Sequence, residues 1–161
     1  MIKTSVEWAP LPIRIVLGIG FIYHGFPKLF SAEGHQMFEG MLTQSGVPAP
    51  NIMSYLVGVV EFFGGLILIA GAYVGAVSIL LIIDMLVAAF LVHLPNGFNF
   101  IHITGMADSG PTFGMPGYEV ILLYIAGLLA LLLGGAGALS VDDAWSRKSR
   151  SVMTDRDLAA A

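Results

Sequence analysis

The chain has 161 residues, of which 57% are hydrophobic and only 11% are charged, and its net charge is −4 at pH 7. Soluble domains are about a quarter charged and disordered chains are polar, so this composition excludes disorder and disfavours a soluble protein. The negative charge disfavours nucleic-acid binding, and the lack of cysteine excludes disulfides, thiolate metal sites and iron–sulfur ligation. The composition indicates an integral membrane protein.

Four stretches are apolar over the roughly 20 residues that a helix needs to cross a bilayer. They cover residues 12–30, 52–70, 74–94 and 118–139. The second and third stretches are so close in sequence that they are expected to form a tight antiparallel hairpin. We therefore predict an all-α integral membrane four-helix bundle in up-down order, with a domain over residues 1–140 and a polar cytoplasmic tail over residues 141–161.

Basic residues predict how this bundle is oriented. Lys3 precedes the first stretch, and neither of the two long loops contains Lys or Arg after Lys28. The remaining basic residues follow the fourth stretch: Arg147, Lys148, Arg150 and Arg156. By the positive-inside rule, both termini face the cytoplasm and both long loops face outward. This predicts a multi-pass protein of the inner (plasma) membrane.

Glycine and the long loops carry weaker signals. Small residues allow close packing of membrane helices, although a slot for a flat ligand would also need them. The loop over residues 95–117 is rich in aromatic and apolar residues, and we expect it to fold back as a lid or to lie in the membrane interface. His35 and His102, in the two long loops, are expected to be solvated.

Two carboxylates lie deep in the predicted helices, where each charge costs roughly 2.5–3.5 kcal/mol and needs a partner or a function. Glu61 and Asp84 lie about ten residues into adjacent helices, which places both near the midplane of the bilayer. Because two ionised carboxylates repel, we expect at least one of them to be protonated or paired with a cation. Arg14 is the predicted counter-ion of Glu61, either as a salt bridge between helices or as part of a ligand site.

A second group of ionisable residues lies toward the predicted outer face. His24 and Lys28 share one face of the first helix, because they are four residues apart. His93 ends the third helix and Glu119 opens the fourth, so the four side chains are expected to converge on an outward-facing vestibule. Two simpler roles remain open: Lys28 as a snorkelling anchor, and Glu119 as a complement to the helix dipole.

Several short motifs occur in a fixed order along the chain. They are Arg-x3-Gly-x5-His-Gly-x2-Lys-Leu beginning at Arg14, Gly-x2-Glu-x2-Gly-Gly beginning at Gly58, a helix ending in His93, and a loop leading into Gly117-Tyr118-Glu119. With this set the chain resembles the DoxX family of small four-helix membrane proteins over residues 10–140. The resemblance implies a polar site of Arg14, His24, Lys28, Glu61, His93 and Glu119, with Asp84 matching less closely.

The resemblance also implies a redox setting, because relatives include the membrane subunit of a thiosulfate:quinone oxidoreductase. The chain lacks the cysteine that would carry a sulfur intermediate, so any quinone-linked oxidoreductase activity would depend on a partner for electrons. We therefore expect a membrane subunit of a redox complex that interacts with quinone. His24 or Lys28 would donate to the quinone carbonyls, and Glu61 or Glu119 would pass protons.

Two alternatives remain open. The chain can instead be a non-catalytic subunit that assembles or docks a larger respiratory or other membrane complex. A b-type haem protein with His24 and His93 as axial ligands is disfavoured, because their depths in the membrane differ. We expect no covalently bound cofactor, no metal site and no nucleic-acid partner; the expected partners are membrane lipid and other membrane or redox subunits.

Overall fold

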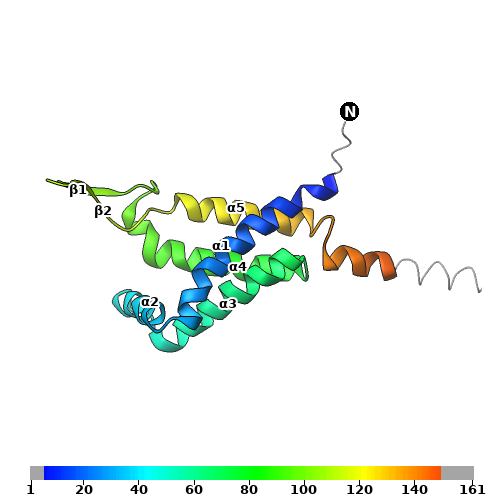
Figure 1. Ribbon diagram of the computed structural model, residues 1–161, viewed down its shortest axis with the longest axis horizontal. Coiled ribbons are helices and arrows are strands. Elements are labelled where there is room, and N and C mark those ends of the chain that lie inside the picture. The colour runs from blue at the N-terminus through cyan, green and yellow to red at the C-terminus, as the bar shows by residue number, and fades with distance from the viewer. Residues whose placement is uncertain (1–5, 150–161) are drawn as a thin grey trace, which may run out of the picture.

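The computed structural model describes residues 6–149 as a helical molecule with one short β-hairpin (Figure 1). Its main elements are α1 (Pro10–Phe30), α2 (Ala32–Gln44), α3 (Pro50–Ala70), α4 (Val74–Ala88), β1 (Ile103–Ala107), β2 (Gly110–Phe113) and α5 (Glu119–Gly134). A short 3-10 helix (Val6–Trp8) precedes α1, and α4 continues as a π-helical turn (Ala89–His93) and a 3-10 turn (Leu94–Asn96). Residues 141–149 are also helical.

The four long helices lie side by side, with α1 against α3, α3 against α4, and α5 against both α4 and α1. The helix α2 and the β-hairpin lie at one end of the molecule, which we call the hairpin end (Figure 1). The turn between α3 and α4 and the helix over residues 141–149 lie at the other end, which we call the tail end. This arrangement defines a long axis along which residues can be placed.

Three segments of the described chain are long and apolar enough to cross a membrane: Val6–Phe30, Pro50–Ala70 and Val74–Asn96. The fourth predicted span is shorter than expected, because α5 has 16 residues and ends at Gly134 instead of continuing to residue 139. Gly135 and Gly137 have positive φ angles of 78° and 68°, whereas the φ of a right-handed α-helix is negative. The up-down order of four complete spans and the cytoplasmic termini therefore stay predictions, and Lys3, Arg150 and Arg156 lie outside the described residues.

The long helices expose apolar side chains and bury several polar ones. Val16, Ile19 and Leu133 are 68%, 57% and 85% exposed, whereas Arg14 and Ser54 are completely buried. This pattern is the reverse of that in a soluble domain and is suited to a surface that contacts lipid. The protein is therefore a membrane protein, as the composition predicts.

Both long loops contain structure that the sequence analysis did not predict. The first contains α2, which begins where the Ser31 hydroxyl accepts a hydrogen bond from the Gly34 N–H at 3.1 Å. The second contains the antiparallel pair β1–β2, which runs from Ile103 opposite Phe113 to Ala107 opposite Gly110, with a shift of register between Ile103 and Gly105. The β-hairpin extends away from the helices, so the fold is not all-α, and this part of the loop over residues 95–117 does not fold back as a lid (Figure 1).

The predicted close packing by glycine is confirmed between α1 and α3. A Cβ atom on Gly25 would lie 2.5 Å from the Phe62 nitrogen, and one on Gly65 would lie 2.6 Å from the Gly18 oxygen. Side chains at these positions would separate the two helices, so glycine sets the distance between α1 and α3.

At the tail end, the segment after α5 is docked onto the turn between α3 and α4. The Asp142 carboxylate accepts hydrogen bonds from the backbone N–H groups of Tyr73 at 2.8 Å and Val74 at 3.0 Å. Tyr73 directly precedes α4 and Val74 is its first residue, so neither N–H has a carbonyl partner within the helix. Asp142 therefore caps α4 from 68 residues farther along the chain.

We expect Asp142→Ala to lower the free energy of unfolding by about 1 kcal/mol, the usual contribution of a helix cap. Thermal unfolding in mild detergent measures this loss. Asp108→Ala, in the exposed turn of the β-hairpin, is the matched control and should leave the transition unchanged. An equal loss in the two variants would show that Asp142 is not a specific cap.

Candidate functional site

A cavity of about 460 Å³ lies between the helices in the half of the molecule toward the hairpin end. Five of the seven predicted site residues line it: His24, Lys28, Glu61, Asp84 and His93. They come from α1, α3, α4 and the π-helical turn, and the rest of the lining is largely apolar. The structure thus brings most of the predicted polar residues to one place in the membrane-spanning part of the chain.

An ion pair between Lys28 and Glu61 dominates this cavity. The side chains of both residues are about nine-tenths buried, and the Lys28 ammonium donates directly to Glu61 Oε2. The ammonium also donates to the His24 carbonyl oxygen at 2.9 Å and lies 4.5 Å from the ring centre of Phe38. Lys28 therefore points into the protein, and the interpretation of Lys28 as a snorkelling anchor is wrong.

The predicted pairing of Glu61 with Arg14 is also wrong. Arg14 is fully buried at the tail end, where its Nη2 atom donates to the carbonyl oxygens of Ala138 and Leu139, each at 3.1 Å. Arg14 lies 14 residues before Lys28 on α1, which corresponds to about 20 Å along the helix axis. Arg14 therefore joins α1 to the turn after α5 and does not reach the cavity.

Asp84 adds a second carboxyl group to the cavity, and Tyr124 adds a hydroxyl group. Asp84 Oδ2 is buried and has no hydrogen-bond partner within residues 6–149. The Tyr124 ring packs edge-on against Phe21 with centroids 5.2 Å apart, and its hydroxyl fits beside the bare α-carbon of Gly20. Sequence analysis missed Tyr124, although a tyrosine in the middle of an apolar helix is an available signal.

The two histidines of the cavity differ in environment. The His93 Nδ1 atom lies 2.8 Å from the Pro116 carbonyl oxygen, so Nδ1 donates to this oxygen and orients the ring. His24 is exposed and packs edge-on against Tyr23 with ring centroids 5.7 Å apart. Glu119 does not line the cavity, because its Oε2 atom accepts the Phe100 N–H at 2.9 Å. Three of the four residues predicted to form the vestibule therefore converge.

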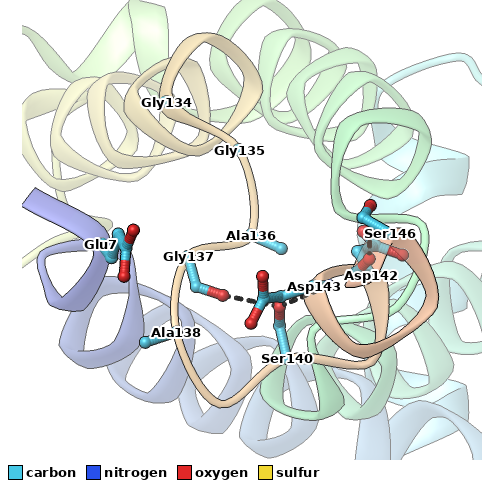
Figure 2. Close-up of a pocket in the computed structure, with 10 residues that line it drawn as sticks. All are labelled: Glu7, Gly134, Gly135, Ala136, Gly137, Ala138, Ser140, Asp142, Asp143 and Ser146. Carbon is cyan, nitrogen blue, oxygen red and sulfur yellow. Dashed lines mark hydrogen bonds between the residues drawn. The ribbon is translucent and has the colours of Figure 1, made fainter. Parts of the chain in front are cut away.

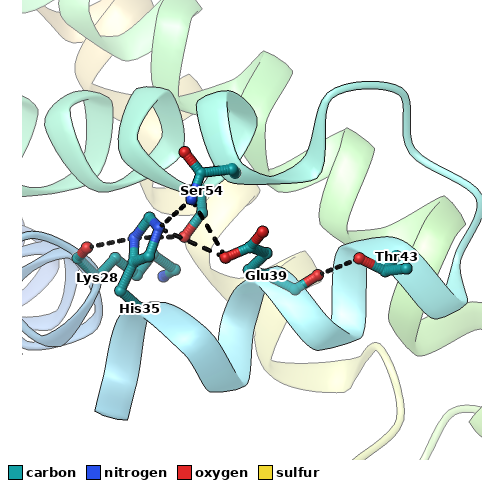
Figure 3. A network of polar contacts seen from close by, with 6 residues as sticks. Lys28, His35, Glu39, Thr43 and Ser54 are labelled. Atoms are coloured by element: carbon teal, nitrogen blue, oxygen red, sulfur yellow. Dashed lines mark hydrogen bonds and ion pairs between the residues drawn. The ribbon is translucent and has the colours of Figure 1, made fainter. Parts of the chain in front are cut away.

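The helix α2 forms one wall of the cavity and is held by a polar network around His35 (Figure 3). His35 Nδ1 lies 3.0 Å from the Lys28 carbonyl oxygen and 3.1 Å from the Ser54 hydroxyl. Its Nε2 lies 3.2 Å from the Asn51 amide nitrogen, and its ring stacks on Tyr55 at 3.9 Å. His35 is 7% exposed, so the prediction that it is solvated is wrong.

A second, smaller cavity of about 240 Å³ lies at the tail end (Figure 2). Glu7, Asp142 and Asp143 line it beside the turn over residues 134–140. Arg147 donates to Asp143 at 2.9 Å, and this hydrogen bond raises the pKa of the exposed Arg147 guanidinium. None of the seven predicted site residues lines this cavity.

Together, the long apolar helices and the cavity between them, with its few polar side chains, define a small helical membrane protein with a candidate site inside its membrane-spanning part. The model of the DoxX family matches residues 9–94, which contain α1 through α4 and the π-helical turn. The chain belongs to the DoxX family.

The chain is also similar in sequence to three bacterial proteins. An uncharacterized membrane protein, Rv3486, of Mycobacterium tuberculosis is 30% identical over 142 residues, covering 85% of this chain and 81% of the relative. An uncharacterized protein of Haemophilus influenzae is 27% identical and covers 84% of this chain and 90% of its own length. The "Putative oxidoreductase CatD" of Bacillus subtilis is 29% identical over 94 residues, or 58% of this chain and 66% of CatD. No solved structure matches the chain.

Proposed function

We propose that the protein is a membrane subunit of a redox complex and binds a quinone in the larger cavity. The observation that carries this proposal is the convergence of polar side chains from several helices on one largely apolar cavity. A quinone head group has a flat apolar ring and two carbonyl acceptors, so it needs apolar walls and a few hydrogen-bond donors. The cavity volume of about 460 Å³ lies in the usual range for small-molecule sites.

The lining of the cavity offers both requirements. Lys28, His24 and Tyr124 carry donors that suit a carbonyl oxygen, and Glu61 and Asp84 are carboxylates that can take up or release protons. The apolar walls include four methionines: Met37, Met41, Met85 and Met115. Methionine is flexible and polarizable, so these side chains can adapt to an aromatic ring and to substituents on it.

Electrons would reach the quinone from a partner subunit. The chain contains no cysteine for an iron–sulfur cluster or a dithiol, so a redox centre of either kind would belong to that partner. One relative of the chain, CatD, is named as an oxidoreductase, and this name supports a redox role.

Quinone content tests the proposal. The protein is purified in mild detergent and extracted with organic solvent, and the bound quinone is quantified per chain. We expect about one quinone per chain, reduced about tenfold in Glu61→Gln, because an interaction with a charged group contributes about 1.5–3 kcal/mol. Glu33→Gln makes the same chemical change at an exposed position of α2 and should leave the quinone content unchanged.

The opposite results favour the other roles. Quinone at the level of the surrounding lipid would support a non-catalytic docking subunit. The β-hairpin supports that alternative, because it extends beyond the helices and carries exposed apolar side chains. Ile103, Met106 and Phe113 are 56%, 78% and 65% exposed. A Soret absorbance band in the purified protein would instead support haem binding at His24 and His93.

A further inference from the structure

The larger cavity occupies only one half of the bundle. Its deepest residues toward the tail end are Phe21 on α1, Glu61 on α3, Asp84 on α4 and Tyr124 on α5. On all four helices, the other residues that line the cavity lie closer to the hairpin end. These four side chains therefore form the floor of the cavity.

A closely packed apolar layer lies between this floor and the tail end. It contains Leu17, Leu68, Leu81, Leu128 and Leu131, all of which are at most 7% exposed. Along α1, the layer spans the seven residues from Phe21 back to Arg14, which corresponds to about 10 Å. Buried apolar side chains in proteins are close-packed and leave few voids that could hold water.

The opposite side of the cavity reaches the surface. Its rim includes Met37 on α2 and Phe100 and Met115 in the segment around the β-hairpin. These side chains are 74%, 53% and 46% exposed, in contrast to the buried leucines below the floor. The ionisable groups of the cavity thus lie on the side of the apolar layer that faces the hairpin end.

We propose that the larger cavity exchanges water and protons with the side of the membrane that carries the β-hairpin and is closed to the side that carries the helix over residues 141–149. This one-sided access does not depend on which ligand occupies the cavity. If the proposed quinone binds there, its protons are exchanged with the hairpin side alone. The proposal also holds for either orientation of the protein in the membrane.

The lack of native cysteine allows a direct test by single-cysteine labelling. Val57→Cys and Ile121→Cys place a thiol in the cavity, and Leu131→Cys places one in the apolar layer. Met106→Cys marks the hairpin side and Ser146→Cys marks the tail side, since both positions are exposed. Each variant is reconstituted in sealed vesicles, and a small membrane-impermeant thiosulfonate is applied from one side at a time.

We expect both cavity thiols to react from the same side as Met106→Cys, at least about tenfold faster than from the other side, because the packed layer excludes water. Leu131→Cys should stay unreactive from both sides. Faster labelling from the Ser146→Cys side, equal labelling from both sides, or no labelling of either cavity thiol would overturn the proposal. If one cavity variant fails to fold, the other decides the result.

A quinone analogue added before labelling separates this proposal from the proposed function. Slower labelling of Val57→Cys in its presence supports quinone binding in the cavity. One-sided labelling that the analogue does not slow would keep the access proposal and reject quinone as the ligand.

Discussion

Lys28→Met is expected to lower the free energy of unfolding by about 3–5 kcal/mol, which is the usual effect of removing one partner of a buried ion pair. The variant leaves the Glu61 carboxylate in an apolar cavity without its cation, and the carbonyl oxygen of His24 without its side-chain donor. Methionine retains most of the volume of lysine, so packing against Phe38 is largely preserved. Thermal unfolding in mild detergent measures the loss.

The double variant Lys28→Met with Glu61→Gln removes both charges together. We expect it to recover much of the stability that the single Lys28→Met variant loses, and the double-mutant cycle isolates the interaction between the two side chains. Arg147→Met is the matched control, because it breaks the ion pair with Asp143 at the exposed tail end. An exposed pair contributes little, so equal losses in Lys28→Met and Arg147→Met would contradict a special role for the buried pair.

Hydropathy was sufficient to locate α3 and α4, whose observed starts lie within two residues of those predicted. Hydropathy locates these helices because a membrane span needs a long apolar run, and only a few stretches of the chain provide one. The end of α5 was not predictable in this way, because residues 135–139 remain apolar after the helix ends. There the backbone conformation of Gly135 and Gly137 decides the boundary, and hydropathy does not report it.

The positions of charged residues predicted which side chains line the cavity better than they predicted which of them form ion pairs. Burial cost identified Lys28, Glu61 and Asp84, which all line the cavity. The partner of Glu61 was misassigned because Arg14 was treated as able to reach inward, whereas α1 carries it about 20 Å from Lys28. Depth in the predicted span over residues 12–30 does not separate the two candidates, because Arg14 and Lys28 lie equally far from its middle. Only the structure shows that Lys28 meets Glu61.

The structures of the two long loops were missed for a different reason. The helix α2 has only 13 residues and is much less apolar than the long helices, so a search for apolar runs of membrane length does not find it. The burial of His35 depends on contacts with Lys28 and Ser54, which are distant in sequence and cannot be read from its neighbours. Tertiary contacts thus decide features that local composition leaves open.

Gly25→Ala is expected to destabilise the protein by about 1–3 kcal/mol, because an added methyl group overfills the contact between α1 and α3. The new Cβ atom would lie 2.5 Å from the Phe62 nitrogen and 2.9 Å from the Gly58 oxygen. Both are backbone atoms, so the helices must separate to relieve the contact. The Glu61 Cβ atom lies 3.0 Å away, so we also expect quinone content to fall as the Lys28–Glu61 pair is displaced.

Gly40→Ala provides the matched control on α2, because nothing lies within 4 Å of the added Cβ atom. Alanine favours helix over glycine by about 0.5–1 kcal/mol, so this variant should be unchanged or slightly more stable. Opposite signs for the same substitution would show that the packing of α1 on α3, and not the helical preference of alanine, determines the result. A Gly25→Ala protein that keeps both its stability and its quinone would indicate that α1 and α3 can separate without disturbing Glu61, and the close contact at Gly25 would then have no part in forming the site.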